Sequence, residues 1–489
     1  RSDSGMLSYV GRVNYSYDDK YLFEFMLRSD ASAKCAPQKY WGMFPSWSAG
    51  WVISDEKWFD KDKTKIDFLK IRGSFGILGK DNVNAWLWTQ LYTRNPDKGP
   101  IFGTNSSTNT SATIRMPKQG VNPDVHWDKT YKTNFGIDMA FLKNRMSANL
   151  DFYYDMGREM FASHQGTSYY PNTVGIQPAP ENFGEVDTYG VELSLGWKDK
   201  IGKDMSYWVK LTTGYNDNKI RETGWKAAYD FDKLVRNERS DRGLWGYECI
   251  GMFRSYQEIN EYFDKYSITK YLGNTKENVH PGMLIYKDVR GQYDESTGTF
   301  GPADGIVDEQ DYIKISHRAS NPYGGTLNFG FSYKDFSISA QFGASWGAYS
   351  LVPTTMRKES YSEYSNVSAM WKDMFVYEDI YDANNIVTVA QNRNAKYPNI
   401  RYSSVNGAPS TFWKVSAATV QLRNMTVAYA LPKEWLKIIG ISSCRFNLTC
   451  QNVFNFLNPY PEGAWASWAG SYGYYPNLRK FTLGVNVSF

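Results

Sequence analysis

Apolar and polar residues alternate one by one along much of this chain. Between residues 145 and 156, Met146, Leu150 and Phe152 take one parity while Asn149 and Asp151 take the other. Successive side chains of a β-strand point to opposite faces, so a strict period of two predicts a strand with one apolar and one polar face. The same alternation recurs in four further segments, which are 188–198, 337–346, 444–451 and 481–489.

Extended to the whole chain, this pattern predicts thirteen strands. They are 6–17, 21–30, 45–53, 68–78, 130–141, 145–156, 188–198, 205–216, 323–334, 337–346, 413–431, 443–456 and 480–489. Most of them reach the roughly 9–11 residues that a tilted strand needs to cross a bilayer. They exceed the usual globular strand of about 5–6 residues, which favours a membrane protein.

The connections between these strands alternate strictly between short and long. The short ones are 18–20, 54–67, 142–144, 199–204, 335–336 and 432–442. The long ones are 31–44, 79–129, 157–187, 217–322, 347–412 and 457–479. Short turns on one side and large loops on the other are typical of outer-membrane barrels. We therefore predict an all-β fold, a transmembrane antiparallel β-barrel with long extracellular loops. A soluble protein of several β-sheets is the competing interpretation.

The number of strands is odd, and that affects the predicted extent of the barrel. The last strand follows a long loop, so it should run inward and leave Phe489 in the periplasm. By the same alternation the first strand also runs inward. A closed bacterial single-chain barrel has an even number of strands. We therefore expect further strands to precede Arg1 in the complete protein.

Composition agrees with this interpretation and excludes some others. Aromatic residues make up 17% of the chain, with 37 tyrosines, which suits strands and the aromatic girdles of membrane barrels. The net charge of +4 gives no support for nucleic-acid binding, which needs a clustered basic face. The sequence has no run of eighteen apolar residues, the length that a transmembrane helix would need. Cys444 and Cys450 lie about 20 Å apart on one predicted strand, too far to form a disulfide.

Several stretches resemble the SusC-like TonB-dependent transporters of Bacteroidetes. They are LSYVGRVNYSYDDKYLFEFMLRSDAS (7–32), WGMFPSWSAGWVISDEKWF (41–59), FLKIRGSFGILGKDN (68–82), NPDVHWDKTYKTNFGIDMAFLKNRMSANLDFYY (122–154), VDTYGVELSLGW (186–197), VQLRNMTVAYALPKEWLKIIGISSCRFNLTCQNVFNF (420–456) and YPNLRKFTLGVNVSF (475–489). Each motif is modestly specific, but their order and spacing cover the chain from end to end.

The resemblance implies a barrel of 22 strands around an N-terminal plug. Residues 1–489 would then be the C-terminal part of that barrel. Nine earlier strands, the plug and the segment that contacts TonB would precede Arg1, in agreement with the parity of the strands. The family also implies a SusD-like surface lipoprotein that caps the barrel as a lid. We expect an integral protein of the bacterial outer membrane.

The sequence offers no convincing catalytic set. Residues 343–347 spell G-x-S-x-G, but that motif needs a strand-to-helix turn, and no helical pattern follows here. The four histidines, His126, His164, His280 and His317, are scattered without metal-binding spacing. We therefore predict that the protein is not an enzyme.

An acidic segment in the loop 217–322 is a candidate calcium site. It contains four aspartates around a glycine turn, which are Asp288, Asp304, Asp308 and Asp311. It resembles a family loop of the form D-x-N-G-D-G-x-I-D-x-x-D, and closely spaced carboxylates suit a hard cation. However, Arg290 replaces an expected ligand and an insertion separates the two halves. An acidic solvated turn is the competing interpretation.

Aromatic residues in the long loops are the candidate substrate site. Flat rings stack on sugar faces and also hold peptides, so we predict capture by Trp86, Trp88, Trp465, Trp468 and Tyr472. The loops 217–322 and 347–412, with Trp245, Tyr247, Tyr361, Tyr364 and Trp371, are predicted to seat the lipoprotein. Packing of these rings against one another or the lid is the alternative, because aromatics also dominate ordinary interfaces.

These observations support a hypothesis of function. The protein would import an oligomeric nutrient across the outer membrane with energy transmitted by TonB, and an oligosaccharide is favoured over a peptide. Its partners would be the SusD-like lipoprotein, the TonB complex, outer-membrane lipid and the substrate. A barrel that serves in structure or surface assembly is the alternative from a different class.

Overall fold

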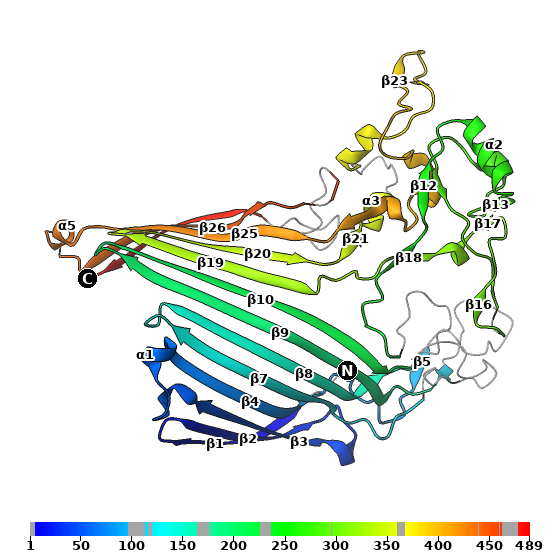
Figure 1. Cartoon of the computed structure of the whole chain (residues 1–489). Helices are drawn as coiled ribbons and strands as arrows, with labels where there is room; N and C mark the ends of the chain where they lie inside the picture. Colours follow the sequence, from blue (N-terminus) through cyan, green and yellow to red (C-terminus); the bar gives the residue numbers. More distant parts are fainter. Residues whose placement is uncertain are drawn as a thin grey trace. The chain divides into compact units, whose positions relative to one another are not determined.

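The computed structural model describes residues 5–95, 113–115, 120–163, 176, 178–224, 236–294, 296–358, 367–438, 440–458, 460–461 and 478–489. Thirteen strands form one antiparallel sheet, and each strand lies next to its neighbour in that order along the chain. They are β1 (Met6–Tyr17), β2 (Tyr21–Ser32), β3 (Trp41–Val52), β4 (Ile66–Lys80), β7 (Asp128–Phe141), β8 (Met146–Ala162), β9 (Glu181–Ile201), β10 (Met205–Glu222), β19 (Tyr323–Tyr333), β20 (Phe336–Trp346), β25 (Thr419–Ala430), β26 (Ser443–Asn455) and β27 (Lys480–Ser488). All thirteen predicted strands are confirmed (Figure 1).

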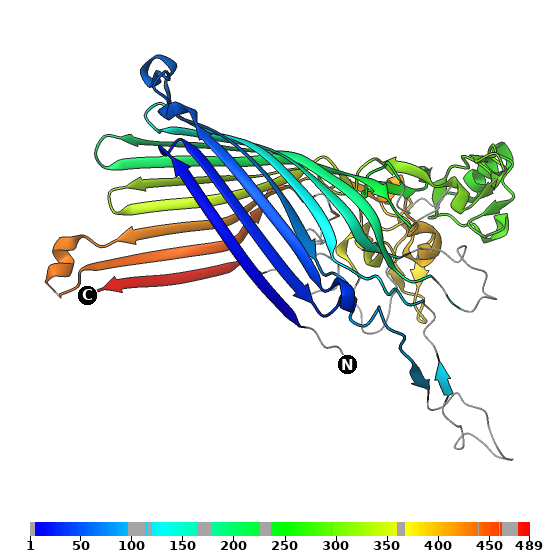
Figure 2. The same ribbon diagram turned by 90° about the horizontal axis from the view of Figure 1, so that it is seen from below.

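The chain divides into two compact units. The first comprises Arg1–Trp197, Thr212–Ala227 and Lys233–Ser240, and the second comprises Lys198–Leu211, Ala228–Asp232 and Asp241–Phe489. In the first unit, the short helix α1 (Lys61–Thr64) lies in the connection from β3 to β4. In the second, α5 (Lys433–Lys437) connects β25 to β26, and the C-terminus lies at the same end of these strands as α5 (Figure 2).

The register of the strands explains the alternation seen in the sequence. Leu150 lies opposite Ile137 on β7 and opposite Leu193 on β9, while Leu483 lies opposite Leu448. The other residues predicted for the apolar face also pair with apolar neighbours, and they are Met146, Phe152, Phe331 and Phe446. Phe152 remains 43% exposed and Leu483 75% exposed. Each unit therefore presents an exposed apolar face, as a lipid-facing surface would.

The loops between β10 and β19 and between β20 and β25 fold against each other. We call their described residues between 241 and 418 the loop module. Its strands are β11 (Leu244–Gly246), β12 (Cys249–Met252), β13 (Lys270–Tyr271), β14 (Leu284–Tyr286), β15 (Tyr293–Asp294), β16 (Thr299–Phe300), β17 (Ile306–Val307), β18 (Ile313–Ser316), β21 (Tyr349–Leu351), β22 (Ile380–Tyr381), β23 (Val387–Val389) and β24 (Lys414–Ser416). Its α-helices are α2 (Tyr256–Lys265), α3 (Thr354–Arg357) and α4 (Ser403–Asn406).

Two further features complete the secondary structure. The first unit also contains the hairpin β5 (Thr93–Asn95) and β6 (Thr113–Arg115). Short 3-10 helices lie at η1 (Pro37–Lys39), η2 (Ile53–Asp55), η4 (Lys276–Asn278), η5 (Glu309–Asp311), η6 (Ala369–Asp373), η7 (Ile400–Tyr402) and η8 (Thr411–Trp413). Among the described residues, helices are all too short or too polar to cross a bilayer.

Buried asparagine and tyrosine side chains join the two loops of the module. Asn406, which is fully buried, accepts a hydrogen bond from the Leu284 amide at 2.8 Å and donates one to the Gly282 carbonyl at 3.0 Å. The Tyr286 hydroxyl donates to the Val405 carbonyl at 3.0 Å. The module has two hydrophobic cores, one that includes Phe253, Tyr271 and Phe375 and a second that includes Trp413. The two loops thus share buried cores of their own.

Several predicted boundaries differ from the structure. The strand predicted for 45–53 begins at Trp41, and those predicted for 145–156 and 205–216 run on to Ala162 and Glu222. Two further differences depend on contacts with distant residues. The strand predicted for 413–431 begins only at Thr419, because Trp413 turns away to pack in the loop module and Lys414–Ser416 pairs with β21. The strand predicted for 188–198 begins earlier, at Glu181, where the polar start of β9 pairs with the end of β8. The starts of β25 and β9 cannot be predicted from the alternation of apolar and polar residues, because both depend on contacts with residues distant in sequence.

Candidate functional site

The first candidate site is the polar face of the sheet in the first unit. Residues that lie opposite one another across six neighbouring strands form one row of this face. The row consists of Asn14, Glu24, Ser48, Ser74, Asn134 and Tyr153. The next row includes Lys132 opposite Asp155. We call this surface the polar wall.

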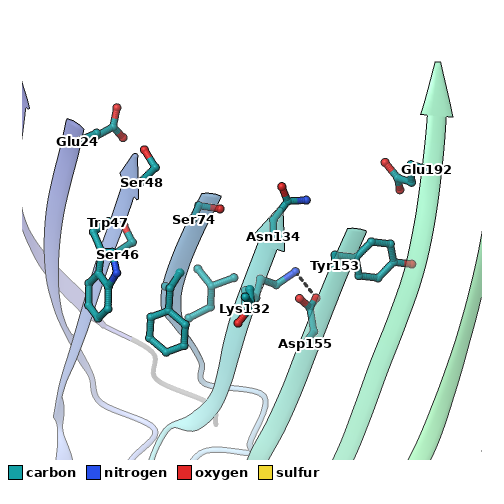
Figure 3. Close-up of a pocket in the computed structure, with 14 residues that line it drawn as sticks. Glu24, Ser46, Trp47, Ser48, Ser74, Lys132, Asn134, Tyr153, Asp155 and Glu192 are labelled. Atoms are coloured by element: carbon teal, nitrogen blue, oxygen red, sulfur yellow. Dashed lines mark ion pairs between the residues drawn. The ribbon is translucent and has the colours of Figure 1, made fainter. Parts of the chain in front are cut away.

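The polar wall borders an open hollow with a volume of about 550 Å³. Figure 3 shows the side chains of Glu24, Ser48 and Asn134 at its edge, together with Tyr153 and Glu192 from β8 and β9. A second hollow of about 490 Å³ shares Glu24, Ser48 and Asn134 with the first, so the two are continuous. The combined surface is large enough for an oligomeric ligand rather than a single small group.

Two ion pairs join charged residues of the polar wall. The Lys132 ammonium lies 2.8 Å from the Asp155 carboxylate, which Figure 3 marks as an ion pair. The Arg12 guanidinium lies 2.5 Å from the carboxylate of Glu24. Both pairs are partly exposed, so each adds little to stability. Their main effect would be on a ligand, because Glu24 and Asp155 each face a cation while Glu192 adds a further carboxylate to the lining of the hollow.

Arg72 forms the most connected group on this wall. Its Nε lies 3.1 Å from Asp138, its Nη2 lies 2.7 Å from Asp151, and its Nη1 donates to Asn134 at 3.2 Å. The guanidinium crosses directly over Gly136, where an added Cβ would come within 2.5 Å of the guanidinium carbon. An alanine at this position would therefore displace the guanidinium from its present place. The sequence analysis did not predict this group, although its members lie at the alternate, polar positions of their strands.

The predicted aromatic site is described in part. Trp86 and Trp88 follow β4 and lie together, with their ring centroids 5.7 Å apart. Trp86 adopts a φ of 70°, which is uncommon for a bulky residue. The indole nitrogen of Trp88 is enclosed without a hydrogen-bond partner. The remaining three candidates, Trp465, Trp468 and Tyr472, lie outside the described residues.

Three of the five aromatic residues predicted to seat a partner are described, and two of them are core residues. Tyr247 and Trp371 are only 3% and 4% exposed and belong to the cores of the loop module. Trp245 is half-buried, donates to the Arg242 carbonyl at 3.1 Å and lies 5.2 Å from the Lys314 ammonium. Tyr361 and Tyr364 lie outside the described residues. Packing inside the module therefore accounts for Tyr247 and Trp371, and the contact of these loops with a lipoprotein stays a prediction.

The acidic segment folds as a set of turns that use their own carboxylates. Asp288 accepts the Gly305 amide at 2.7 Å, and Asp311 accepts the amides of Val289 and Asp308 at 2.7 and 2.9 Å. The other two carboxylates, of Asp304 and Asp308, also accept nearby backbone amides.

Burial raises the pKa of both Asp288 and Asp311. Arg290 donates to the carbonyls of Gln310 and Tyr312, so it occupies the centre of the segment. Within the part of the chain that the structure describes, no group of three or more acidic, histidine or cysteine residues is arranged to hold a metal. The four aspartates lie in one loop segment, but their contacts are those of a hydrogen-bonded turn.

Comparison with known proteins gives consistent relatives. No protein-family profile matches the chain. TonB-dependent receptor P39 of Formosa agariphila is 24% identical over 99% of this chain and 46% of its own length. TonB-dependent receptor SusC of Bacteroides thetaiotaomicron is 26% identical over 99% of this chain and 44% of its own length. The chain thus spans about half the length of these relatives.

A solved structure shares the fold. The structure described as the RagAB peptide transporter matches with a TM-score of 0.72 and 18% identity, covering 100% of this chain and 48% of its own. A second, described as the RagAB peptide importer in the 'closed-closed' state, matches with a TM-score of 0.69. At this level of identity the match concerns the fold alone.

Proposed function

Because the chain is homologous to SusC and to other TonB-dependent receptors along nearly its whole length, we propose that it forms part of a TonB-dependent importer of an oligomeric nutrient. It is an outer-membrane protein, and its sheet supplies the membrane-spanning strands. The observation that carries this proposal is the match to receptors over 99% of the chain, together with thirteen strands of alternating polarity. In the complete importer, the plug and the segment that contacts TonB would precede these strands.

An oligosaccharide is the favoured substrate class. The polar wall presents hydroxyl and amide groups from Ser48, Ser74 and Asn134, while two of its carboxylates, of Glu24 and Asp155, lie in ion pairs. Such a surface suits an uncharged polar oligomer, which binds through many weak hydrogen bonds and a few rings. The Trp86–Trp88 pair would supply stacking surfaces in the loop region. A peptide is the alternative substrate, and a barrel for surface assembly is the alternative function.

The proposed partners follow from the same homology. A SusD-like surface lipoprotein would cover the long-loop side, and TonB would act from the periplasm. Calcium bound by Asp288, Asp304, Asp308 and Asp311 is also proposed, and it would require the present carboxylate–amide bonds to rearrange. Calorimetric titration of the complete protein with calcium tests it, and an absence of binding heat at millimolar calcium would contradict it.

The experiment that tests the function measures uptake in cells. The complete gene would be deleted and restored, and growth compared on neutral oligosaccharides and on peptides as sole carbon sources. We expect growth on one oligosaccharide class to be lost, and the same loss when TonB is inactivated in cells with the intact gene. Loss of growth on peptides alone would support the peptide alternative. Unchanged growth on all of them, with the protein present at the surface, would contradict import.

A further inference from the structure

A β-hairpin projects from the loop module, and most of its residues are exposed to solvent. It comprises residues 376–392, and we call it the acidic hairpin. Its strands are β22 and β23, and its base is closed by two hydrogen bonds between Val376 and Asn392, of 3.1 and 2.8 Å. All residues from 380 to 391 are exposed. Figure 1 shows β23 at the projecting end of the module.

The exposed part of the acidic hairpin is rich in large apolar side chains. They are Ile380 (50% exposed), Tyr381 (53%), Ile386 (62%), Val387 (45%) and Val389 (36%). An isolated two-stranded hairpin is marginally stable in water at best. Contiguous exposed apolar surface on an ordered segment marks a site of interaction. The concentration of these residues on so short a segment therefore points to a surface that another molecule covers.

The acidic hairpin is rigidly built. Phe375 and Val376, at its base, are buried in the module, at 0% and 4% exposure. At its tip, the Asp382 carboxylate accepts the amides of Asn384 and Ile386 at 2.9 and 2.8 Å. The Asp379 carboxylate accepts the Gln391 amide at 2.6 Å. A preformed element loses little conformational entropy when it binds, which raises its affinity for a partner.

The negative charge of the acidic hairpin makes some binding partners less favourable than others. Between residues 378 and 392 it carries Glu378, Asp379 and Asp382, and no lysine or arginine. Anionic lipid headgroups attract basic segments, so a lipid surface with phosphate groups would be repelled. Two copies of the hairpin would also bring like charges together, which disfavours self-association. A protein with an apolar patch bordered by lysine or arginine fits both properties.

We propose that the acidic hairpin is a docking element for the surface lipoprotein, and that it binds an apolar patch with a basic border on that protein. This inference rests on the proposed function, because it assumes that a lipoprotein covers the loop side. The inference specifies the segment to which the lipoprotein binds and the apolar and charged contacts that hold it. Tyr247 and Trp371 are buried in the cores of the module, so the exposed apolar side chains of this contact come from the hairpin instead.

The test uses the complete importer with its lipoprotein, purified together in detergent. Ile386→Asp introduces a charge in place of an exposed apolar side chain and leaves the backbone bonds of the hairpin in place. We expect the dissociation constant for the lipoprotein to rise at least tenfold, as for a central apolar contact of an interface. Asn384→Asp is the matched control, since it adds the same charge to the same turn without removing apolar surface, and it should change the constant by less than threefold.

Cross-linking in cells identifies the molecule that covers the hairpin. A photo-reactive amino acid at Val387 should form an adduct with the lipoprotein. An adduct with a second copy of the importer or with lipopolysaccharide would overturn the proposal. Equal retention of the lipoprotein by the wild type and Ile386→Asp would overturn it too, but would leave the proposed function intact. Failure of the wild type to retain any lipoprotein would instead contradict the lid in the proposed function.

Discussion

Single residues determine the contacts within the polar wall. Gly136 is an example, because its lack of a side chain leaves room for Arg72. The Arg72 guanidinium, which pairs with Asp151, lies where it would clash with a Cβ at position 136. We expect Gly136→Ala to displace Arg72 and to lower the free energy of unfolding by about 1 kcal/mol, the scale of a partly exposed charged hydrogen bond. Urea unfolding of the complete protein in lipid vesicles would measure it.

Two controls test the cause that we assign to this effect. Gly73→Ala should leave the unfolding midpoint unchanged, because its nearest neighbour would be the Asn134 carbonyl at 3.9 Å. In a background with Arg72→Met, Gly136→Ala should lose its effect, as a double-mutant cycle requires for coupled residues. Equal destabilisation in both backgrounds would mean that the glycine acts through the backbone instead.

At the level of elements, the alternation predicts that apolar and polar positions of one strand tolerate charge very differently. Leu150 lies on the apolar face of β8, opposite Ile137 and Leu193. Leu150→Arg should destabilise the folded protein in lipid by roughly 2–4 kcal/mol, the cost of arginine on a lipid face near the bilayer midplane. Asn149→Arg is the matched control on the next residue, where Asp138 is a neighbour. Equal tolerance of both substitutions would contradict a lipid-facing surface.

The loop module should unfold separately when its core is damaged. Trp413 is 1% exposed, and its indole nitrogen donates to the Asn406 carbonyl at 2.6 Å. Trp413→Ala should cost about 3–5 kcal/mol by leaving a cavity. Limited proteolysis should then cut within residues 241–322 and 347–418 while the strands of the main sheet, β19 and β20 included, stay protected. Trp435→Ala, at a residue 63% exposed on α5, should leave the pattern of cleavage unchanged.

The same elements show how far the sequence predicts the structure. Thirteen strands follow from a period of two, because a strand with one apolar face carries its own signature in every second residue. The loop module carries no such signature. Its strands are two to four residues long, and its core joins residues more than a hundred positions apart, such as Asn406 and Leu284. The burial of Tyr247 and Trp371 and the Arg72 group depend on these distant contacts, so they could not be predicted from the sequence.

At the scale of the whole molecule, the polar wall and the aromatic loops would serve different steps of import. The loops would capture the substrate, and the wall would line its passage. Several charged groups of the wall lie in ion pairs, so the wall would let an uncharged oligomer pass without holding it strongly. Stacking rings in the loops would instead provide the initial affinity. Of the five predicted aromatic residues, Trp86 and Trp88 are placed side by side by the structure. Capture at these rings therefore remains a prediction for the intact importer.

Replacing the predicted rings tests this capture step directly. Alanine at Trp86, Trp88, Trp465 and Trp468 together should slow growth on the cognate nutrient, because each ring would lose its contact with the substrate. The effect should be greatest at low nutrient concentration, where capture limits uptake, and small at saturating concentration. Surface display would be checked with an antibody, and Trp435→Ala serves as a control for the loss of an exposed tryptophan outside these loops. Uptake that is unchanged at every concentration would mean that these rings only pack the loops, and that the substrate is first held by other residues.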